Sequence, residues 1–179
     1  MILILVAVKE ELSKKDLPNI QIHYTGVGKI NAAIETLKVI KNYAPSLIIN
    51  YGTAGSLNKE LRGLVEVTRF FQRDMDATPL RFKIGQTPFD DISEISFGSE
   101  GYSCGTGDSF LTKTRKLKTD LVDMEAYAIA KICYLENIRF KCFKFISDHA
   151  DEGANNDWIE NVSLGKKLFA KRIKNLCAN

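Results

Sequence analysis

The sequence has little of what metal sites need. Its 179 residues include only two histidines, His23 and His149, and its four cysteines show no paired spacing of the kind that holds zinc. We therefore expect no metal site. Neither histidine has a candidate nucleophile beside it, so we expect both to be structural or exposed to solvent. Cysteines that form no evident framework are typical of the reducing cytoplasm.

Long apolar runs and dense positive charge are missing as well. No apolar run approaches the length of a membrane span, and the apolar start at residues 1–6 lacks the charged leader and small-residue cleavage site of a signal peptide. The formal net charge of +3 is spread along the chain, and no Lys/Arg cluster is interleaved with aromatic residues. We expect a cytoplasmic protein that binds neither membranes nor nucleic acid.

The pattern of apolar residues indicates a single domain over residues 1–179, because no linker, repeat or low-complexity segment interrupts it. Strand-like runs alternate with helical ones. The strand-like segments are residues 2–8, 20–25, 47–51 and 140–146, with several short ones between 65 and 97. The helical segments start at residue 30, cover 124–135, and close the chain from 158 to 176. This alternation predicts an α/β fold of three layers (α/β/α) around a central mixed, largely parallel sheet.

Three acidic residues, Glu11, Glu125 and Asp148, lie just beyond strand-like runs. The carboxyl ends of parallel strands share one edge of a sheet, and ligands bind there. Three carboxyl groups at that edge suggest a general acid, a general base and an anchor for hydroxyl groups. The alternatives are that Glu125 only complements a helix dipole and that Asp148 only caps a helix or sits in a loop.

Two glycine-containing segments follow strands. Residues 26–29 (GVGK) resemble part of a phosphate loop, but a Walker A motif would need glycine at His23, and a dinucleotide fingerprint would need glycine at Asn31. We therefore expect a strand-to-helix turn and no nucleotide cofactor, nor any other. Residues 52–55 (GTAG) are small enough to let backbone amides approach a ligand, although an ordinary turn needs the same residues.

Taken together, seven stretches of the chain resemble the nucleoside phosphorylase/nucleosidase superfamily, and among its branches the 5′-methylthioadenosine/S-adenosylhomocysteine nucleosidases. They occur in the family's order. They are residues 7–12 (AVKEEL), 26–33 (GVGKINAA), 48–55 (IINYGTAG), 73–78 (RDMDAT), 106–110 (TGDSF), 122–126 (VDMEA) and 146–151 (ISDHAD). The resemblance implies the three-layer α/β fold and cleavage of an N-ribosidic bond.

The resemblance also implies roles for the acidic residues. Asp148 would protonate nitrogen 7 of the purine, and Glu11 would activate the attacking water. Glu125 would bind the ribose hydroxyls while Met124 packs on the sugar. Ser147, beside the acid, belongs to the implied substrate-binding residues. Cleavage builds negative charge on the leaving purine and positive charge on the ribose, and these residue types suit both.

Further substrate-binding residues follow from the same resemblance. Phe110 would stack on the base and Leu111 would offer backbone contacts to it. Gly55 belongs to the small-residue segment beside the ligand. Thr53 and Lys144 stand where the family places groups that contact water or phosphate, and the nucleosidases usually carry arginine at the position of Lys144.

The nucleophile distinguishes a hydrolase from a phosphorylase. Phosphorylases of this superfamily place arginine in the loop that here holds Asn50, and another after the first strand, where this chain has residues 9–11 (KEE). Two glutamates would repel phosphate. We expect hydrolysis of a purine nucleoside such as 5′-methylthioadenosine or S-adenosylhomocysteine, as in methionine salvage, with release of adenine. The alternatives are a phosphorylase, a futalosine hydrolase and a non-catalytic nucleoside-binding protein.

We also expect a homodimer. The middle of the chain carries apolar residues that we expect to be exposed: Phe70, Phe71, Met75 and Leu80. A small sheet protein would have to cover such an apolar patch, for example with a second subunit. The resemblance implies that residues 73–78 lie near the subunit contact. The alternative is that these residues fill the protein's own core.

Overall fold

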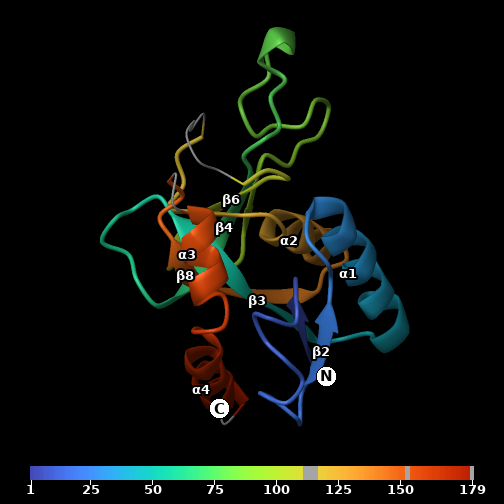
Figure 1. The fold of residues 1–179 in the computed structure, drawn as a ribbon. Coiled ribbons are helices and arrows are strands. Elements are labelled where there is room, and N and C mark those ends of the chain that lie inside the picture. The colour runs from blue at the N-terminus through green and yellow to red at the C-terminus, as the bar shows by residue number, and fades with distance from the viewer. Residues whose placement is uncertain (111–116, 152–153, 178–179) are drawn as a thin grey trace.

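The computed structural model describes residues 1–110, 117–151 and 154–177, and within them helices pack against a sheet (Figure 1). The strands are β1 (Ile2–Val6), β2 (Gln21–Tyr24), β3 (Leu47–Ser56), β4 (Leu64–Gln72), β5 (Glu94–Ser96), β6 (Tyr102–Thr106), β7 (Leu121–Asp123) and β8 (Arg139–Asp148). The helices are α1 (Lys29–Tyr43), α2 (Ala126–Leu135), α3 (Ala154–Asn161) and α4 (Lys166–Cys177), with one 3-10 turn, η1 (Thr78–Leu80). No helix in the described ranges is long and apolar enough to cross a membrane.

The sheet is mixed, with most of its pairings parallel. Parallel pairs join β1 to β2, β1 to β3, β3 to β8, β4 to β6 and β6 to β7, whereas β3–β7, β4–β5 and β4–β8 are antiparallel. β3, β7, β6, β4 and β8 each pair with two others of this group, so they close into a barrel-like ring. The mixed α/β class is confirmed. The three-layer arrangement stays a prediction.

A hydrophobic cluster lies on each side of β1, because successive side chains of a strand point to opposite faces. Leu3 and Leu5 belong to a cluster that includes buried residues of α1 and α2. Ile4 and Val6 belong to a second cluster that includes Phe169 of α4. Figure 1 shows α1 and α2 together on one side and α3 and α4 on the other. The continuous apolar run of β1 is thereby explained by burial on both faces.

Three local predictions were wrong. The closing helix is divided into α3 and α4 by a turn at residues 162–165, where Gly165 packs directly on the ring of Phe145 and leaves no room for a side chain. The strand predicted at residues 47–51 is longer than expected, because β8 also pairs with residues 52–55, so these belong to β3 and the alternative of a turn there is excluded. Phe70 is not on a surface patch. It is fully buried, and its ring packs on Phe97 and Phe140.

Candidate active site

The structure brings Glu11, Glu125 and Asp148 to the wall of one cavity of about 230 Å³. The cavity lies where β3, β7 and β8 end and where the segments after β1 and β6 meet them. The described residues that line it are Ala7, Val8, Glu11, Val27, Thr53, Ala54, Gly55, Arg73, Ser109, Phe110, Val122, Asp123, Met124, Glu125, Ser147, Asp148, Ala150 and Trp158. Eight of the ten residues named from the sequence are among them, Lys144 is not, and Leu111 lies outside the described residues.

Glu11 is buried against β3. The backbone N–H of Thr53 donates to its Oε1 at 2.6 Å, and the Thr53 hydroxyl donates to the same oxygen at 2.7 Å. The indole N–H of Trp158 in turn donates to the Thr53 hydroxyl at 2.8 Å, which fixes its direction. Burial raises the pKa of Glu11, and the positive charge of Lys144 offsets part of that rise. Glu11 is therefore a fixed, poorly solvated carboxyl group inside the cavity.

Asp148 is the last residue of β8 and is also buried. Its Oδ1 accepts the backbone N–H of Ala150 at 2.9 Å, and its Oδ2 accepts the Ser147 hydroxyl at 2.8 Å. A Cβ atom at Gly55 would lie 2.6 Å from Oδ1, so only glycine leaves space for the carboxyl group there. Burial raises the pKa of Asp148 despite these hydrogen bonds. A raised pKa favours the protonated form that a general acid needs.

Glu125 directly precedes α2, which begins two residues later than the predicted start at residue 124. Its Oε1 accepts the backbone N–H of Gly28 at 2.9 Å, which ties it to the start of α1. Burial, with a smaller contribution from the Asp123 carboxylate, raises the pKa of Glu125 to about 8. Glu125 is thus protonated near neutral pH and can donate a hydrogen bond as well as accept one. Met124, its neighbour, also lines the cavity.

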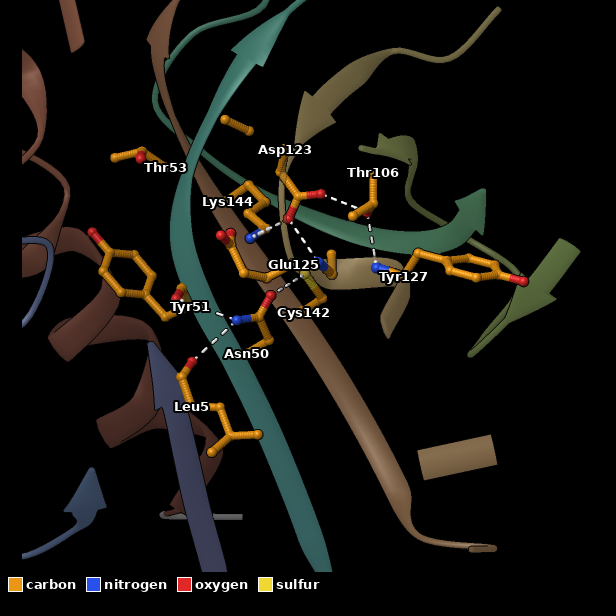
Figure 2. A network of polar contacts seen from close by, with 12 residues as sticks. Leu5, Asn50, Tyr51, Thr53, Thr106, Asp123, Glu125, Tyr127, Cys142 and Lys144 are labelled. Atoms are coloured by element: carbon orange, nitrogen blue, oxygen red, sulfur yellow. Dashed lines mark hydrogen bonds and ion pairs between the residues drawn. The ribbon is translucent and has the colours of Figure 1, made fainter. Parts of the chain in front are cut away.

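Lys144 lies behind this wall, in a buried ion pair with Asp123 (Figure 2). Its Nζ is 2.8 Å from Oδ2 of Asp123, which also accepts the backbone N–H of Ala126, while Oδ1 of Asp123 accepts the Thr106 hydroxyl. The Lys144 ammonium holds the pKa of Asp123 below its usual range, although burial acts in the opposite direction. A Cβ atom at Gly52 would lie 3.1 Å from Glu11 Oε1 and 3.3 Å from Lys144 Nζ, so the glycine leaves space for both side chains.

Sequence reasoning missed three cavity residues with polar chemistry. Asp123 was only part of a motif, although an acidic residue at the end of a buried strand signals a partner. Trp158 was assigned to an apolar stripe, yet a buried indole N–H needs an acceptor, here Thr53. Arg73 donates to the backbone carbonyls of Gly107 and Ser109 beside the cavity. No group of three or more His, Cys, Asp or Glu residues suited to a metal ion occurs in the part of the chain that the structure describes.

Comparison with known proteins identifies the family of this chain. The family model described as the phosphorylase superfamily matches residues 17–104 and 98–178. A relative from Haemophilus influenzae, named 5′-methylthioadenosine/S-adenosylhomocysteine nucleosidase, is 30% identical over 88% of this chain and 79% of its own length. A relative of the same name from an Exiguobacterium species is 29% identical over 83% of this chain and 77% of its own length.

Solved structures agree on the fold. The nucleosidase of Helicobacter pylori with butyl-thio-DADMe-Immucillin-A superimposes with a TM-score of 0.89 at 23% identity, covering 99% of this chain and 97% of that one. At such identity the likeness concerns the fold alone. The sequence matches carry the assignment, and the chain belongs to the phosphorylase superfamily and, within it, to the family of the 5′-methylthioadenosine/S-adenosylhomocysteine nucleosidases.

Proposed function

We propose that this chain is a purine nucleosidase that hydrolyses the N-ribosidic bond of 5′-methylthioadenosine or S-adenosylhomocysteine and releases adenine. One observation carries the proposal beyond family membership. Three carboxyl groups, those of Glu11, Glu125 and Asp148, line a single cavity and are each held by hydrogen bonds to backbone N–H groups. Such a cavity combines an acid, a base and a sugar anchor.

The roles are those that the family resemblance implies, and the local environments are compatible with them. Asp148, with its raised pKa, donates a proton to nitrogen 7 of the purine as the bond breaks. Glu11 accepts a proton from the attacking water; its two bonds from Thr53 keep it oriented while the water loses that proton. Glu125 binds the ribose hydroxyls. Phe110, at the cavity wall, stacks on the base, and Met124 packs against the sugar. Ser147, through its bond to Asp148, fixes the acid.

Water rather than phosphate is the nucleophile in this proposal. Phosphate needs cations at the cavity wall, and Arg73 is the only basic residue among the described residues that line it. Arg73 is engaged with the carbonyls of Gly107 and Ser109. Lys144 is not among the described lining residues and is paired with Asp123. Glu11 would repel a phosphate dianion placed near the sugar.

One assay tests the reaction. The protein is incubated with 5′-methylthioadenosine, S-adenosylhomocysteine, futalosine and inosine, with and without phosphate, and the released base and sugar are identified. We expect adenine and a free ribose sugar, at a rate independent of phosphate. Glu11→Gln should abolish release, whereas Glu10→Gln, which removes the same charge from an exposed neighbour, should not. A ribose-1-phosphate product would make the chain a phosphorylase, and adenine binding without turnover would make it a binding protein.

A homodimer is the second part of the proposal. The apolar residues Ile30, Ile34 and Leu37 follow one side of α1, Val27 lies just before it, and all four are exposed, Ile30 to 72%. Val27 also lines the cavity, so a second copy seated on this stripe would border the substrate site. An apolar stripe of this kind is a poor surface for a monomer.

Light scattering tests the dimer. The wild-type protein should have the mass of two chains, and Ile34→Lys should have the mass of one. Leu168→Lys, at an exposed residue of α4, is the control and should stay dimeric. A wild-type monomer at micromolar concentration would refute this part. The single domain, the three-layer arrangement, the cytoplasmic location and the place in methionine salvage remain further proposals that rest on the family.

A further inference from the structure

One side of the cavity is built from three segments that are far apart in sequence. Val27 comes from the segment before α1, Arg73 from the segment after β4, and Ser109 and Phe110 from the segment after β6. β4 and β6 pair with each other, but the residues beyond them have left the sheet. Something other than sheet pairing must therefore hold the three segments at the distance that a nucleoside requires.

Each of these segments carries a charged residue, and the three charged residues bind one another. They are Lys29, Asp74 and Asp108. Lys29 Nζ is 2.6 Å from Asp74 Oδ1 and 3.6 Å from Asp108 Oδ2. The backbone N–H of Asp108 donates to Asp74 Oδ2 at 2.9 Å, and the backbone N–H of Lys29 donates to Asp108 Oδ1 at 2.8 Å. Every member is thus tied to both others, by a side chain or by the backbone.

Lys29 and Asp108 are also connected to Glu125, the residue proposed to bind the ribose hydroxyls. α1 begins without a side-chain cap of its own, because its N-cap residue is Gly28. The first two N–H groups are capped from elsewhere: that of Gly28 by Glu125 and that of Lys29 by Asp108. Gly28 has φ +95°, and a Cβ atom there would lie 3.2 Å from Asp108, so the backbone is fitted closely between the two carboxyl groups. A shift of Asp108 would move the amide that holds Glu125.

We propose that Lys29, Asp74 and Asp108 are positioning residues of the nucleoside cavity. They hold the three segments together, so that Phe110 faces the base and Glu125 faces the ribose. The kinetic effect that we expect rests on the proposed function, whereas the effect that we expect on the structure of the cavity does not. Exposed ion pairs contribute little to folding stability, and all three side chains retain some exposure. Their effect should therefore be on the geometry of the cavity more than on the stability of the fold.

The kinetic test uses Asp74→Asn, Asp108→Asn and Lys29→Met, with Asp90→Asn as the matched control. Asp90 pairs with Lys131 at similar exposure and is not among the residues that line the cavity. We expect the KM for the nucleoside to rise about 10-fold or more in the three variants, since a charge-assisted hydrogen bond is lost in each. kcat should stay within about threefold, because the contacts affected bind substrate and transition state alike. Lys29→Met and Asp74→Asn combined should raise KM less than the product of their single effects.

A second readout needs no substrate. Amide hydrogen exchange at Gly28 and Lys29 should become about 10-fold faster or more in Asp74→Asn and Asp108→Asn, and should not change in Asp90→Asn. If the wild type cleaves no nucleoside but exchange responds in this way, the proposed function fails and the positioning role stands. Unchanged exchange, or a KM rise as large in Asp90→Asn, would overturn the positioning role. If one variant does not fold, the other two carry the same test.

Discussion

Glu125→Gln should make the protein more stable at alkaline pH, even though we expect it to impair nucleoside binding. Burial and the nearby Asp123 carboxylate raise the pKa of Glu125 to about 8, from 4.5 for a free glutamate. Glutamine has nearly the same shape, and its side-chain oxygen can still accept the Gly28 N–H that Glu125 accepts at 2.9 Å. The substitution therefore removes the ionisation and keeps the capping interaction.

The sign of the effect follows from proton binding. Between the unfolded pKa of Glu125 and its folded pKa, the folded state holds a proton that the unfolded state has lost. The free energy of unfolding of the wild type must then fall as pH rises through this window. The loss is complete above the folded pKa. Each pKa unit corresponds to about 1.4 kcal/mol, so from about pH 6 to about pH 8 the wild type should lose about 2 kcal/mol that the glutamine variant keeps.

Urea unfolding of both proteins at several pH values measures this difference directly. The control is Glu10→Gln, which removes a carboxylate at an exposed position next to Glu11. We expect the stability of the Glu125 variant relative to wild type to increase steadily over the window, while that of the control stays constant. A difference that does not depend on pH would mean that Glu125 is ionised throughout, and the reasoning from burial would be wrong.

Three further outcomes are expected. Asp148→Asn should slow base release in a single turnover at least about 100-fold, the lower end of a general acid's contribution, and leave the dissociation constant of an uncleavable nucleoside nearly unchanged. Gly165→Ala should lower the free energy of unfolding by about 1–3 kcal/mol in urea, because the new methyl group overlaps the ring of Phe145. Phe70→Ala should cost about 3–5 kcal/mol in the same assay, since Phe70 is fully buried, whereas Leu80→Ala at an exposed site should cost little.

The sequence predicted where the acidic residues would lie because strands and their ends are local features. The buried strands β1 and β8 were visible as apolar runs, and the residues just after or at their ends, Glu11 and Asp148, reach the same cavity. The start of α2 after Glu125 was equally local. Glu11 and Asp148 could thus be placed near one another from the rule that parallel strands end at one edge. That rule does not place Glu125, because β7 runs antiparallel to β3; Glu125 reaches the cavity because β7 pairs with the last residues of β3.

The remaining features depend on contacts between distant segments, which periodicity does not report. The pair between Lys144 and Asp123 joins β8 to β7, and no pattern within either strand identifies the partner. Trp158 fits an apolar stripe equally well whether it faces a core or a cavity. Phe70 was wrongly predicted to be exposed, because an apolar residue on a strand gives the same sequence pattern whether it lies in a core or on a surface patch. Each of these errors concerns which surface a side chain meets, not which element it belongs to.

The buried carboxyl groups at the cavity wall reduce the stability of the fold, but they are the groups that the proposed reaction uses. Glu11, Asp123, Glu125 and Asp148 are all buried, and Lys144, the buried cation among the described residues, pairs with Asp123. Burying more carboxyl groups than cations raises several of their pKa values and destabilises the folded state at alkaline pH. In the proposed reaction, the carboxylate of Glu11 would attract the positive charge that develops on the ribose. Stability is thus lost at the residues where the proposed reaction gains its rate, which is the trade-off expected of a preorganised active site.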